Sequence, residues 1–398
     1  MKRICFVRQS IYPYELSFRR EVETLHSAGF DVHVICLDGR EIDKNHKLEE
    51  IIDGIFVHRI PLFRKKTSVV RYLYDYFSFF TLAAIKLTYL HFRRPFDIIQ
   101  VNTMPDFLVF ATLIPKLLGA KVTLMMQEPM PELWQTLYNS SPPRFLQVVE
   151  QAALAYADTA FTVTQQLKDV YITRGADSKK ISVVLNAPER RFLGLDVCKD
   201  KARPDPDFFT LVSHGAIEER YGHTTMLEAV ALVKSEIPNL RLKILGKGNF
   251  SDELITQIHR KGLENHVQYL GWVSLSQMVN ELHTSDIGIV AQKSSPYSNL
   301  VHTNKMYEFI ALGKPVLASR LKSVEAYFGK DSLYFFEPDN PESLAEGIMD
   351  LHRHPSKRRT LVENSYKLYN EYQWEKQKEI YKSIYFALSG YLSGTTQG

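Results

Sequence analysis

The residues best suited to chemistry lie in one segment, 303–318, whose pattern predicts a helix followed by a buried strand. Thr303 is a good N-cap residue for that helix. The first turn of a helix has N–H groups without partners in the helix, so Thr303, Asn304 and Lys305 form a natural seat for phosphate. Glu308 lies on the same helical face as Lys305, about one turn deeper. A diphosphate at the helix tip would therefore leave the Glu308 carboxylate beside an attached ribose, where it could accept two hydroxyl hydrogen bonds.

The same segment carries a family motif. Glu308 follows Lys305 by three positions, and Gly-Lys-Pro-Val stands at 313–316. This arrangement resembles the retaining, nucleotide-sugar-dependent glycosyltransferases of the two-Rossmann-domain (GT-B) type, in particular the group 4 family. The resemblance implies that Glu308 contacts the ribose of a nucleotide-sugar donor. The family usually carries a second glutamate eight positions earlier, touching the donor sugar, and here that position is Leu300.

Length and patterning predict an α/β protein of two domains. A chain of 398 residues can bury two cores. Apolar, β-branched runs alternate with helical patterns, which is typical of parallel sheets covered on both faces. The expected domains are 1–195 and 208–373, joined by the charged, proline-bearing stretch 196–207. The resemblance implies the GT-B architecture, two Rossmann-like doubly wound domains facing a cleft, with a final helix, 374–390, that packs back on the first domain.

Ligands of open parallel sheets bind beyond the carboxyl ends of the strands, so the loops directly after strands are candidate sites. The loop 213–223 leads from an expected strand into a helix and contains His214, Gly215 and Arg220. The Arg220 guanidinium could clamp a diphosphate and offset charge on the departing nucleotide. A surface arginine paired with one of the two preceding glutamates is the alternative. His214 is either a ligand of donor or acceptor or an ordinary histidine at a strand end.

Two further strand ends complete the expected donor site. Gly246 would allow close approach of the backbone to a nucleotide and Lys247 would add charge, while a tight turn with a solvated lysine is the alternative. Trp272 and Val273 stand where the resemblance implies recognition of the base, unless Trp272 belongs to the core. The predicted donor-binding residues are His214, Gly215, Arg220, Gly246, Lys247, Trp272, Val273, Thr303, Asn304, Lys305 and Glu308.

The expected acceptor site lies in the first domain, again at strand ends. Relatives with similar elements usually carry histidine–aspartate where Gln127 and Glu128 stand here. An acceptor hydroxyl must lose a proton, so Glu128 is the candidate for orienting it. The predicted acceptor-binding residues are Tyr12, Tyr14, Asn102, Asp106, Gln127 and Glu128, and the predicted catalytic residues are Glu128, Arg220 and Lys305.

The sequence predicts neither a metal site nor a cofactor. The thirteen histidines show no H-E-x-x-H spacing, and the Asp-x-Asp match at 205–207 lies in the expected linker. The resembled enzymes hold the diphosphate with basic groups and a helix tip. The three cysteines are odd in number and lack metal-ligand spacing, and no export signal is visible, which together favour a reducing cytosol.

Positive charge is concentrated in the segment 59–94, where eight basic residues face one acidic residue, although the whole chain has a net charge of only +4. The aromatic stretch 69–85 inside this segment is interrupted by charge and shorter than the roughly 20 residues that span a bilayer. Two interpretations remain open. The stretch is either an interfacial helix on an anionic membrane surface or a helix packed on the N-terminal sheet with a solvated basic rim. No nucleic-acid partner is predicted.

The expected function is that of a metal-independent, retaining glycosyltransferase of the hexosyltransferase type. It would move a sugar from a nucleotide-diphospho-sugar to a hydroxyl of a lipid-linked or soluble sugar acceptor, in glycan, polysaccharide or glycolipid biosynthesis. The expected location is the cytoplasm, with peripheral attachment to the inner membrane face as an option. A non-catalytic partner subunit is one alternative, motivated by Leu300 and Gln127, and a nucleotide-sugar epimerase is another. The sequence does not identify base, sugar, acceptor or oligomeric state.

Overall fold

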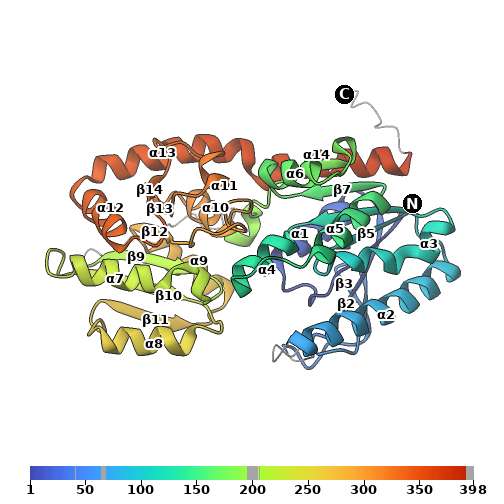
Figure 1. Cartoon of the computed structure of the whole chain (residues 1–398), viewed down its shortest axis with the longest axis horizontal. Coiled ribbons are helices and arrows are strands. Elements are labelled where there is room, and N and C mark those ends of the chain that lie inside the picture. Colours follow the sequence, from blue (N-terminus) through green and yellow to red (C-terminus); the bar gives the residue numbers. More distant parts are fainter. Residues whose placement is uncertain (41, 64–68, 195–204, 206, 391–398) are drawn as a thin grey trace. The chain divides into compact units, whose positions relative to one another are not determined.

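The computed structural model describes residues 1–390 except 41, 64–68, 195–204 and 206 (Figure 1). Contacts divide the chain into two compact units. Unit 1 comprises Met1–Asn186 together with the segment from Glu375 onward, and unit 2 comprises Ala187–Trp374. The expected linker, 196–207, lies almost entirely outside the described residues. The division falls before it because Ala187 and Leu193 already belong to a hydrophobic core of unit 2.

Unit 1 contains an eight-stranded sheet in the order β3-β4-β2-β1-β5-β6-β7-β8. Neighbouring strands are parallel except β3 and β4, which form an antiparallel hairpin. The central strands β1, β2 and β5 are apolar runs that are buried along their whole length, as expected for a parallel sheet. The strands are β1 (Arg3–Val7), β2 (Asp31–Leu37), β3 (Glu49–Ile52), β4 (Ile55–Ile60), β5 (Ile98–Asn102), β6 (Lys121–Met126), β7 (Thr159–Thr162) and β8 (Ile181–Val183).

Strand β3 was not expected from the sequence. Its residues alternate between exposed and half-buried positions, so it lacks the apolar run of a central strand. It joins β4 through Asp53 and Gly54, whose φ angles are 49° and 83°. A two-residue turn with two positive φ angles matches the twist of an antiparallel pair, and Asp-Gly is a favoured sequence for it. The turn dipeptide is therefore a better signal for this strand than its hydrophobicity.

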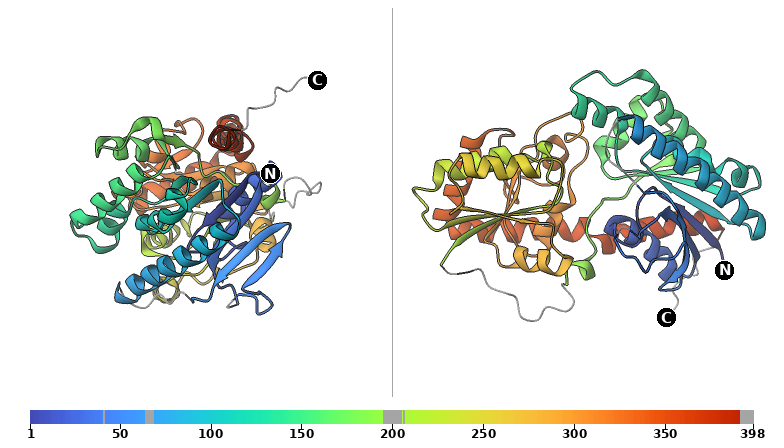
Figure 2. Two further views of the ribbon diagram at one scale, coloured as in Figure 1. Left: turned by 90° about the vertical axis from the view of Figure 1, so that its right-hand side faces the viewer. Right: turned by 90° about the horizontal axis from the view of Figure 1, so that it is seen from below.

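Helices cover both faces of the unit 1 sheet (Figure 2). Right-handed crossovers place α1 on one face and the helices between β4 and β7 on the other. Helix α14 lies on the α1 face, because Tyr381 of α14 and Glu21 of α1 both bond to Gln100 of β5. On the second face, α2 contacts α3, and α5 contacts η1. The helices are α1 (Leu16–Ser27), α2 (Val69–Arg93), the 3₁₀ helix η1 (Asp106–Thr112), α3 (Leu113–Leu117), α4 (Met130–Tyr138), α5 (Arg144–Tyr156), α6 (Gln165–Thr173), the 3₁₀ helix η2 (Ser178–Lys180) and α14 (Trp374–Ser389).

Between β5 and β6 the chain does not form one continuous α-helix. The structure has η1 followed by the short helix α3. Pro115 lies within α3 and has no N–H, so a continuous α-helix would lose one of its backbone hydrogen bonds there. Helix α4 was not expected at all, because Pro129 and Pro131 around its first residue resemble a loop sequence.

The aromatic stretch 69–85 belongs to the longer helix α2, which continues to Arg93. Its inner side packs on β2 and β4, so the helix is part of the N-terminal fold, and any membrane contact concerns its outer side. Four side chains form most of this buried side: Tyr76, Phe79, Ala83 and Leu87. The basic residues 64–66 lie outside the described residues. In the part of the chain that the structure describes, every helix is too short or too polar to cross a membrane.

The last helix, α14, completes the core of unit 1. The Tyr385 hydroxyl lies 2.9 Å from Thr123 Oγ1 of β6, and the Tyr381 hydroxyl donates to Gln100 Oε1 at 2.5 Å. Phe386 stacks on Phe30 with a ring-centre distance of 5.6 Å. The side chains that complete the packing on the first sheet therefore come after the whole of unit 2 in the sequence.

Unit 2 contains a six-stranded parallel sheet in the order β11-β10-β9-β12-β13-β14. Adjacent residues of β9, Leu211 and Val212, belong to different hydrophobic cores, because successive side chains of a strand point to opposite faces. The strands are β9 (Phe209–His214), β10 (Leu240–Leu245), β11 (Val267–Gly271), β12 (Ile287–Val290), β13 (Val316–Ser319) and β14 (Tyr334–Phe336). The helices are η3 (Arg190–Leu193), η4 (Glu219–Tyr221), α7 (His223–Val233), α8 (Ser251–Arg260), α9 (Leu275–His283), α10 (Asn304–Ala311), α11 (Lys322–Glu325), α12 (Pro341–Arg353) and α13 (Pro355–Tyr372).

Candidate functional site

Helix α10 forms as the sequence predicts. Thr303 has extended backbone angles, and its side-chain oxygen accepts a hydrogen bond from the Lys305 N–H at 3.4 Å. The helix ends before Gly313, whose φ of 69° lies in the left-handed region that glycine adopts without strain. The tip of α10 is thus a capped helix N-terminus whose remaining first-turn N–H groups suit an anion.

Lys305 connects this tip to the loop after β9. A Cβ atom added to Gly215 would lie 2.3 Å from Lys305 Cε, so the lysine occupies space that only a glycine leaves free. Its Nζ lies 3.7 Å from the ring centre of Tyr221. Burial of the ammonium group lowers the pKa of Lys305 to about 8, although Glu308 acts in the opposite direction. The result is a poorly hydrated cation held beside a helix tip.

Glu308 lies beside His214 at the end of β9. His214 Nε2 and Glu308 Oε2 are 3.1 Å apart, and the histidine side chain is 4% exposed. Burial, helped by the charge of Lys305, lowers the pKa of His214 to about 3, so the imidazole is neutral at neutral pH. The two groups are in close proximity without forming a hydrogen bond, because His214 Nε2 has no hydrogen-bond partner among the described residues. His214 thus lies beside the carboxylate expected to bind ribose, and its direct contact with donor or acceptor stays a prediction.

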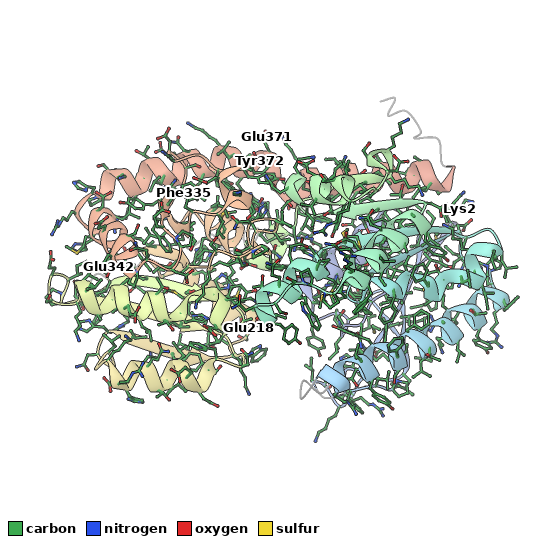
Figure 3. All side chains as sticks on the ribbon, in the orientation of Figure 1. Lys2, Glu218, Phe335, Glu342, Glu371 and Tyr372 are labelled. Carbon is green, nitrogen blue, oxygen red and sulfur yellow. The ribbon has the colours of Figure 1, made fainter. Side chains whose placement is uncertain are left out.

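Arg220 has the glutamate partner that the alternative interpretation required. Its Nε lies 2.7 Å from Oε2 of Glu218, which is labelled in Figure 3. The guanidinium carbon also lies 5.1 Å from the Tyr221 ring centre and 5.3 Å from that of Tyr297. Because Lys305 contacts the same Tyr221 ring, the two expected phosphate-binding cations lie close together around one aromatic side chain.

The glycine-rich turn after β10 packs against the loop after β9. A Cβ at Gly246 would lie 1.8 Å from the carbonyl oxygen of Gly215, and one at Gly248 would lie 2.1 Å from that of Ile217. These glycines are therefore required by contact between two backbones, whereas the sequence suggested close approach to a nucleotide. Lys247 is exposed, as in the alternative interpretation of a tight turn with a solvated lysine.

Trp272 follows β11 and is 77% exposed, so the alternative that it belongs to the core is wrong. Val273 beside it is half-buried and packs against the core that also contains Val212 and Leu245. Both residues follow a strand that lies two places from β9 in the sheet. A large exposed aromatic side chain at this strand end is available to stack on a planar ligand.

Unit 2 therefore brings His214, Gly215, Arg220, Lys305 and Glu308 into one cluster. Thr303 and Asn304 form the helix tip of that cluster, and Gly246 supports it from behind. Sequence reasoning missed the two aromatic residues that hold the cations. Tyr221 could have been noticed, because it stands directly before Gly222, where the resembled family has a basic residue. No sequence signal points to Tyr297.

The predicted acceptor residues of unit 1 are joined by a residue that the sequence did not single out, Glu21. Asn102 Nδ2 donates to Glu21 Oε2 at 2.7 Å, and Gln127 Nε2 donates to Glu21 Oε1 at 3.1 Å. Arg8 in turn donates to Gln127 Oε1 at 3.1 Å. Burial raises the pKa of Glu21. Its place on the apolar side of α1, three residues after Phe18, was the available signal for a buried carboxyl.

The other predicted acceptor residues lie in different surroundings. Asp106 is 3% exposed, and burial, together with Glu150, raises its pKa well above its usual value. Tyr12 is a core residue that packs edge-on against Phe18. Tyr14 is exposed, with its hydroxyl 3.2 Å from His46 Nε2. Glu128 is half-buried just after β6. The structure therefore groups Asn102 and Gln127 but buries Asp106 and Tyr12 in the interior of unit 1.

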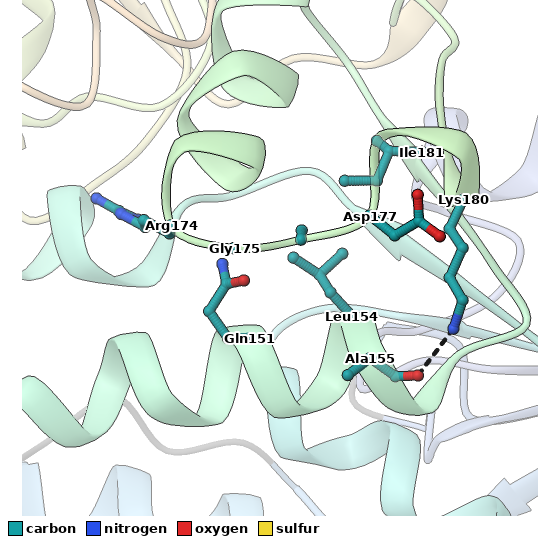
Figure 4. A pocket seen from close by; sticks show the side chains of 9 residues that line it. Gln151, Leu154, Ala155, Arg174, Gly175, Asp177, Lys180 and Ile181 are labelled. Atoms are coloured by element: carbon teal, nitrogen blue, oxygen red, sulfur yellow. Dashed lines mark hydrogen bonds between the residues drawn. The ribbon is translucent and has the colours of Figure 1, made fainter.

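A separate pocket of unit 1 lies between α5 and the turn after α6 (Figure 4). On one wall Lys180 Nζ donates to the Ala155 carbonyl oxygen at 2.9 Å. None of the predicted donor or acceptor residues lines this pocket. Across the described residues, no group of three or more His, Cys, Asp or Glu side chains is placed to hold a metal ion.

Two units, each with a largely parallel sheet covered by helices on both faces, define the GT-B fold. Solved structures share it. Sucrose-phosphate synthase from Thermosynechococcus elongatus matches with a TM-score of 0.76 and 16% identity, covering 98% of this chain and 100% of that one. HepE of Anabaena in complex with UDP matches with a TM-score of 0.71 and 14% identity, covering 97% and 100%.

Sequence comparisons give the family. The model for group 1 glycosyl transferases matches residues 198–368, and the model for the glycosyl transferase 4-like domain matches residues 14–187. The chain belongs to the group 4 type of GT-B glycosyltransferases.

Two relatives also match in sequence. An uncharacterized glycosyltransferase of Methanocaldococcus jannaschii is 23% identical over 180 residues, which are 44% of this chain and 47% of that protein, so the match spans about half of the relative. The N-acetylgalactosamine-N,N'-diacetylbacillosaminyl-diphospho-undecaprenol 4-alpha-N-acetylgalactosaminyltransferase of Campylobacter jejuni is 22% identical over 330 residues, covering 81% of this chain and 82% of that protein.

Proposed function

We propose that this protein transfers a hexose-type sugar from a nucleotide-diphospho-sugar to a hydroxyl group, with retention of configuration and without a metal ion. The observation that carries the proposal is the cluster at the tip of α10, where Lys305, Arg220 and a capped helix N-terminus lie near the carboxylate of Glu308. Cations and a helix tip suit a diphosphate, and the carboxylate suits a ribose.

The cluster assigns a role to each group. Arg220, Lys305 and the first-turn N–H groups would bind the diphosphate, while Glu308 accepts hydrogen bonds from the ribose hydroxyls. The acceptor oxygen bonds to the anomeric carbon on the face from which the diphosphate leaves. The bond from that carbon to the phosphate oxygen breaks, and the acceptor proton passes to the leaving phosphate. The two cations offset the charge that develops on the diphosphate.

Burial prepares the cations for this role. Lys305, with a pKa of about 8, is mostly protonated at pH 7, and a bound diphosphate would favour its charged form further. Arg220 pairs with Glu218 at 2.7 Å when no phosphate is present. Donor binding would therefore replace or share that carboxylate, so the loop after β9 adjusts when the donor arrives.

On the acceptor side we propose a sugar hydroxyl on a lipid-linked acceptor, oriented by Glu128. The name of the Campylobacter jejuni relative describes an acceptor sugar on diphospho-undecaprenol, which supports an acceptor of this chemical kind. Glycan or glycolipid assembly in the cytoplasm is the corresponding role.

Product analysis tests this function. The purified chain is incubated with a panel of nucleotide-diphospho-sugars, with and without short-chain lipid-diphosphate sugars, and the products are separated by mass spectrometry and NMR. We expect one donor to yield an α-linked product from an α-linked donor only when acceptor is present. Conversion of the nucleotide sugar into an epimer would contradict the proposal. Absence of donor binding by calorimetry across the whole panel would instead indicate a non-catalytic subunit.

A further inference from the structure

One side of unit 1 exposes an extended apolar surface. Helix α2 is apolar on both sides, so while its inner side packs on the sheet, the opposite side presents large apolar residues near every fourth position. Helices α3 and α5 continue the surface. We call it the outer apolar face; it consists of Leu73, Phe77, Ile85, Tyr89 and Phe92 of α2, Leu113, Ile114, Leu117 and Leu118 in and just after α3, and Phe145 and Val148 of α5.

The 3₁₀ helix η1 links the three helices that carry this face, because it contacts α2, α3 and α5. Phe77 of α2 stacks on Phe107 of η1 with ring centres 5.1 Å apart, and α2 also contacts α3. Phe110 of η1 meets Tyr156 of α5 edge-on at 5.2 Å. The exposed side chains therefore belong to one packed layer of helices rather than to separate loops.

The most exposed members are large. Leu117 is 78% exposed, Phe92 is 68% exposed and Ile85 is 62% exposed. Soluble proteins expose single apolar side chains routinely, but a contiguous apolar surface of this extent marks a site of interaction. Among the described residues of unit 2, large apolar side chains are exposed at only four scattered positions, Leu232, Ile255, Trp272 and Leu275.

Exposed charge on the helices of the outer apolar face is basic, although two acidic residues of neighbouring elements pair with it, Glu49 with Lys86 of α2 and Asp158 with Lys116 of α3. In the described parts of α2, η1, α3 and α5, the acidic residues are Asp75, Asp106 and Glu150, and all three are buried. Basic residues are exposed at the rim, with Arg93 at the end of α2, Lys121 after α3 and Arg144 at the start of α5. Apolar residues ringed by cations match a bilayer with an anionic surface, where apolar side chains enter the acyl boundary and cations meet headgroups.

We infer that unit 1 docks on anionic membranes through the outer apolar face, with α2 lying in the plane of the interface. A helix of 25 residues is about 37 Å long and would present its whole outer side to the lipid in this orientation. This location extends the sequence-based expectation, which placed the contact in the basic segment 59–94 alone. The inference concerns binding in the absence of donor, so it stands or falls separately from the proposed transfer reaction.

Vesicle co-sedimentation of the full chain tests the inference. Vesicles of phosphatidylcholine with 30% phosphatidylglycerol are compared with pure phosphatidylcholine at low and high salt. We expect binding to the anionic vesicles that weakens with salt. Ile85→Ser, Phe92→Ser and Leu117→Ser together should lower binding roughly tenfold or more, because each loses buried apolar area. Arg93→Gln, Lys121→Gln and Arg144→Gln together should lower it by on the order of a hundredfold at low salt.

The matched control exchanges exposed apolar residues of unit 2, Leu232→Ser and Ile255→Ser, and should bind like the unmodified chain. Circular dichroism and thermal unfolding verify that all variants are folded. Equal binding to neutral and anionic vesicles, or an apolar triple variant that binds normally, would overturn the inference. So would light scattering that shows a dimer of the unmodified chain which the apolar triple variant converts to a monomer, because a second copy would then cover the face.

Discussion

The two units of the chain use their polar residues differently. In unit 2 the predicted residues meet around the tip of α10, where Lys305 lies over Gly215 and His214 lies beside Glu308. In unit 1, Asn102 and Gln127 donate their side-chain hydrogen bonds to the buried Glu21. Polar groups of unit 2 are thus arranged around a helix tip, whereas those of unit 1 are largely occupied by one another. The comparison indicates that unit 2 keeps a local motif, whereas unit 1 uses its polar residues in an internal network.

The largest effect on the rate of transfer is expected for a substitution of Arg220 in unit 2. Arg220→Ala should slow transfer by roughly a hundredfold or more, because the guanidinium stabilises charge on the leaving diphosphate. Steady-state rates at saturating donor measure this. Arg353→Ala is the control, since Arg353 also pairs with a glutamate of unit 2, at 2.8 Å, but lies on α12. A normal rate for Arg220→Ala would show that the cluster at α10 does not act on the leaving group.

Glu308→Ala should weaken donor binding by about 1 to 3 kcal/mol through the loss of charged hydrogen bonds to ribose. The thermal stability of the variant should fall modestly, because the Glu308 carboxylate favours the charged form of the buried Lys305. Calorimetry with the donor nucleotide gives the affinity, and Glu325→Ala provides a control on α11. An unchanged affinity would remove the ribose assignment.

Gln127→Ala in unit 1 should mainly lower the stability of the protein. It removes one donor from the buried Glu21 carboxyl and leaves Arg8 without its contact to Gln127, which should cost about 1 to 3 kcal/mol of stability. Donor affinity should not change. Chemical denaturation measures the loss, with the exposed Gln135→Ala as control. A stable Gln127→Ala protein that has lost acceptor turnover would instead place Gln127 at the acceptor.

The stability of unit 2 should decrease at acidic pH. Burial lowers the pKa of His302 to about 4, and the ring accepts from the Tyr307 hydroxyl at 2.8 Å. An unfolded histidine has a pKa near 6.5, so the unfolded state binds the proton first and stability falls as pH drops from about 6.5 toward 4. This group alone should account for about 2 kcal/mol between pH 7 and pH 5.

His302→Gln should reduce that pH dependence by the share of this one group, as measured by denaturation of the full chain at the two pH values, because His214, whose pKa is also lowered, keeps its own share. The exposed His259→Gln should leave it unchanged. If His302→Gln retains the full slope, other buried groups carry the acid sensitivity.

The smallest effect is expected for metal removal. Because cations and a helix tip would bind the diphosphate, transfer should continue at an unchanged rate in excess chelator. Loss of activity that a divalent ion restores would show that the cluster at α10 is incomplete without a metal.

Sequence reasoning worked best where the structure is decided locally. Thr303 and Gly313 delimit α10 through cap chemistry that involves only neighbouring residues, and the apolar runs of β1 and β5 are recognisable on their own. It failed where a partner distant in sequence decides. Glu21 resembles any glutamate of an amphipathic helix until Asn102 and Gln127 come into place around it. The Tyr221 ring acquires its role only when Lys305 packs on it.

The sequence also does not show why a particular residue type is needed at a position. The turn at Gly246 was correctly noted as special, but the need for a glycine comes from the carbonyl of Gly215, which would meet a Cβ at 1.8 Å. The glycine in the sequence indicates that a side chain must be absent at this position, but it does not show which neighbouring group occupies the space. Contacts between loops of adjacent strands supply that second piece of information.

The position of α14 has a consequence for synthesis of the protein. Tyr381 and Tyr385 contact β5 and β6 of unit 1, yet they follow every residue of unit 2 in the chain. A ribosome therefore releases all eight strands of the first sheet long before the helix that covers one side of Gln100 and Thr123. During that interval unit 2 can fold to completion while unit 1 waits with part of its apolar surface open, so the first unit to be made is the last to be finished.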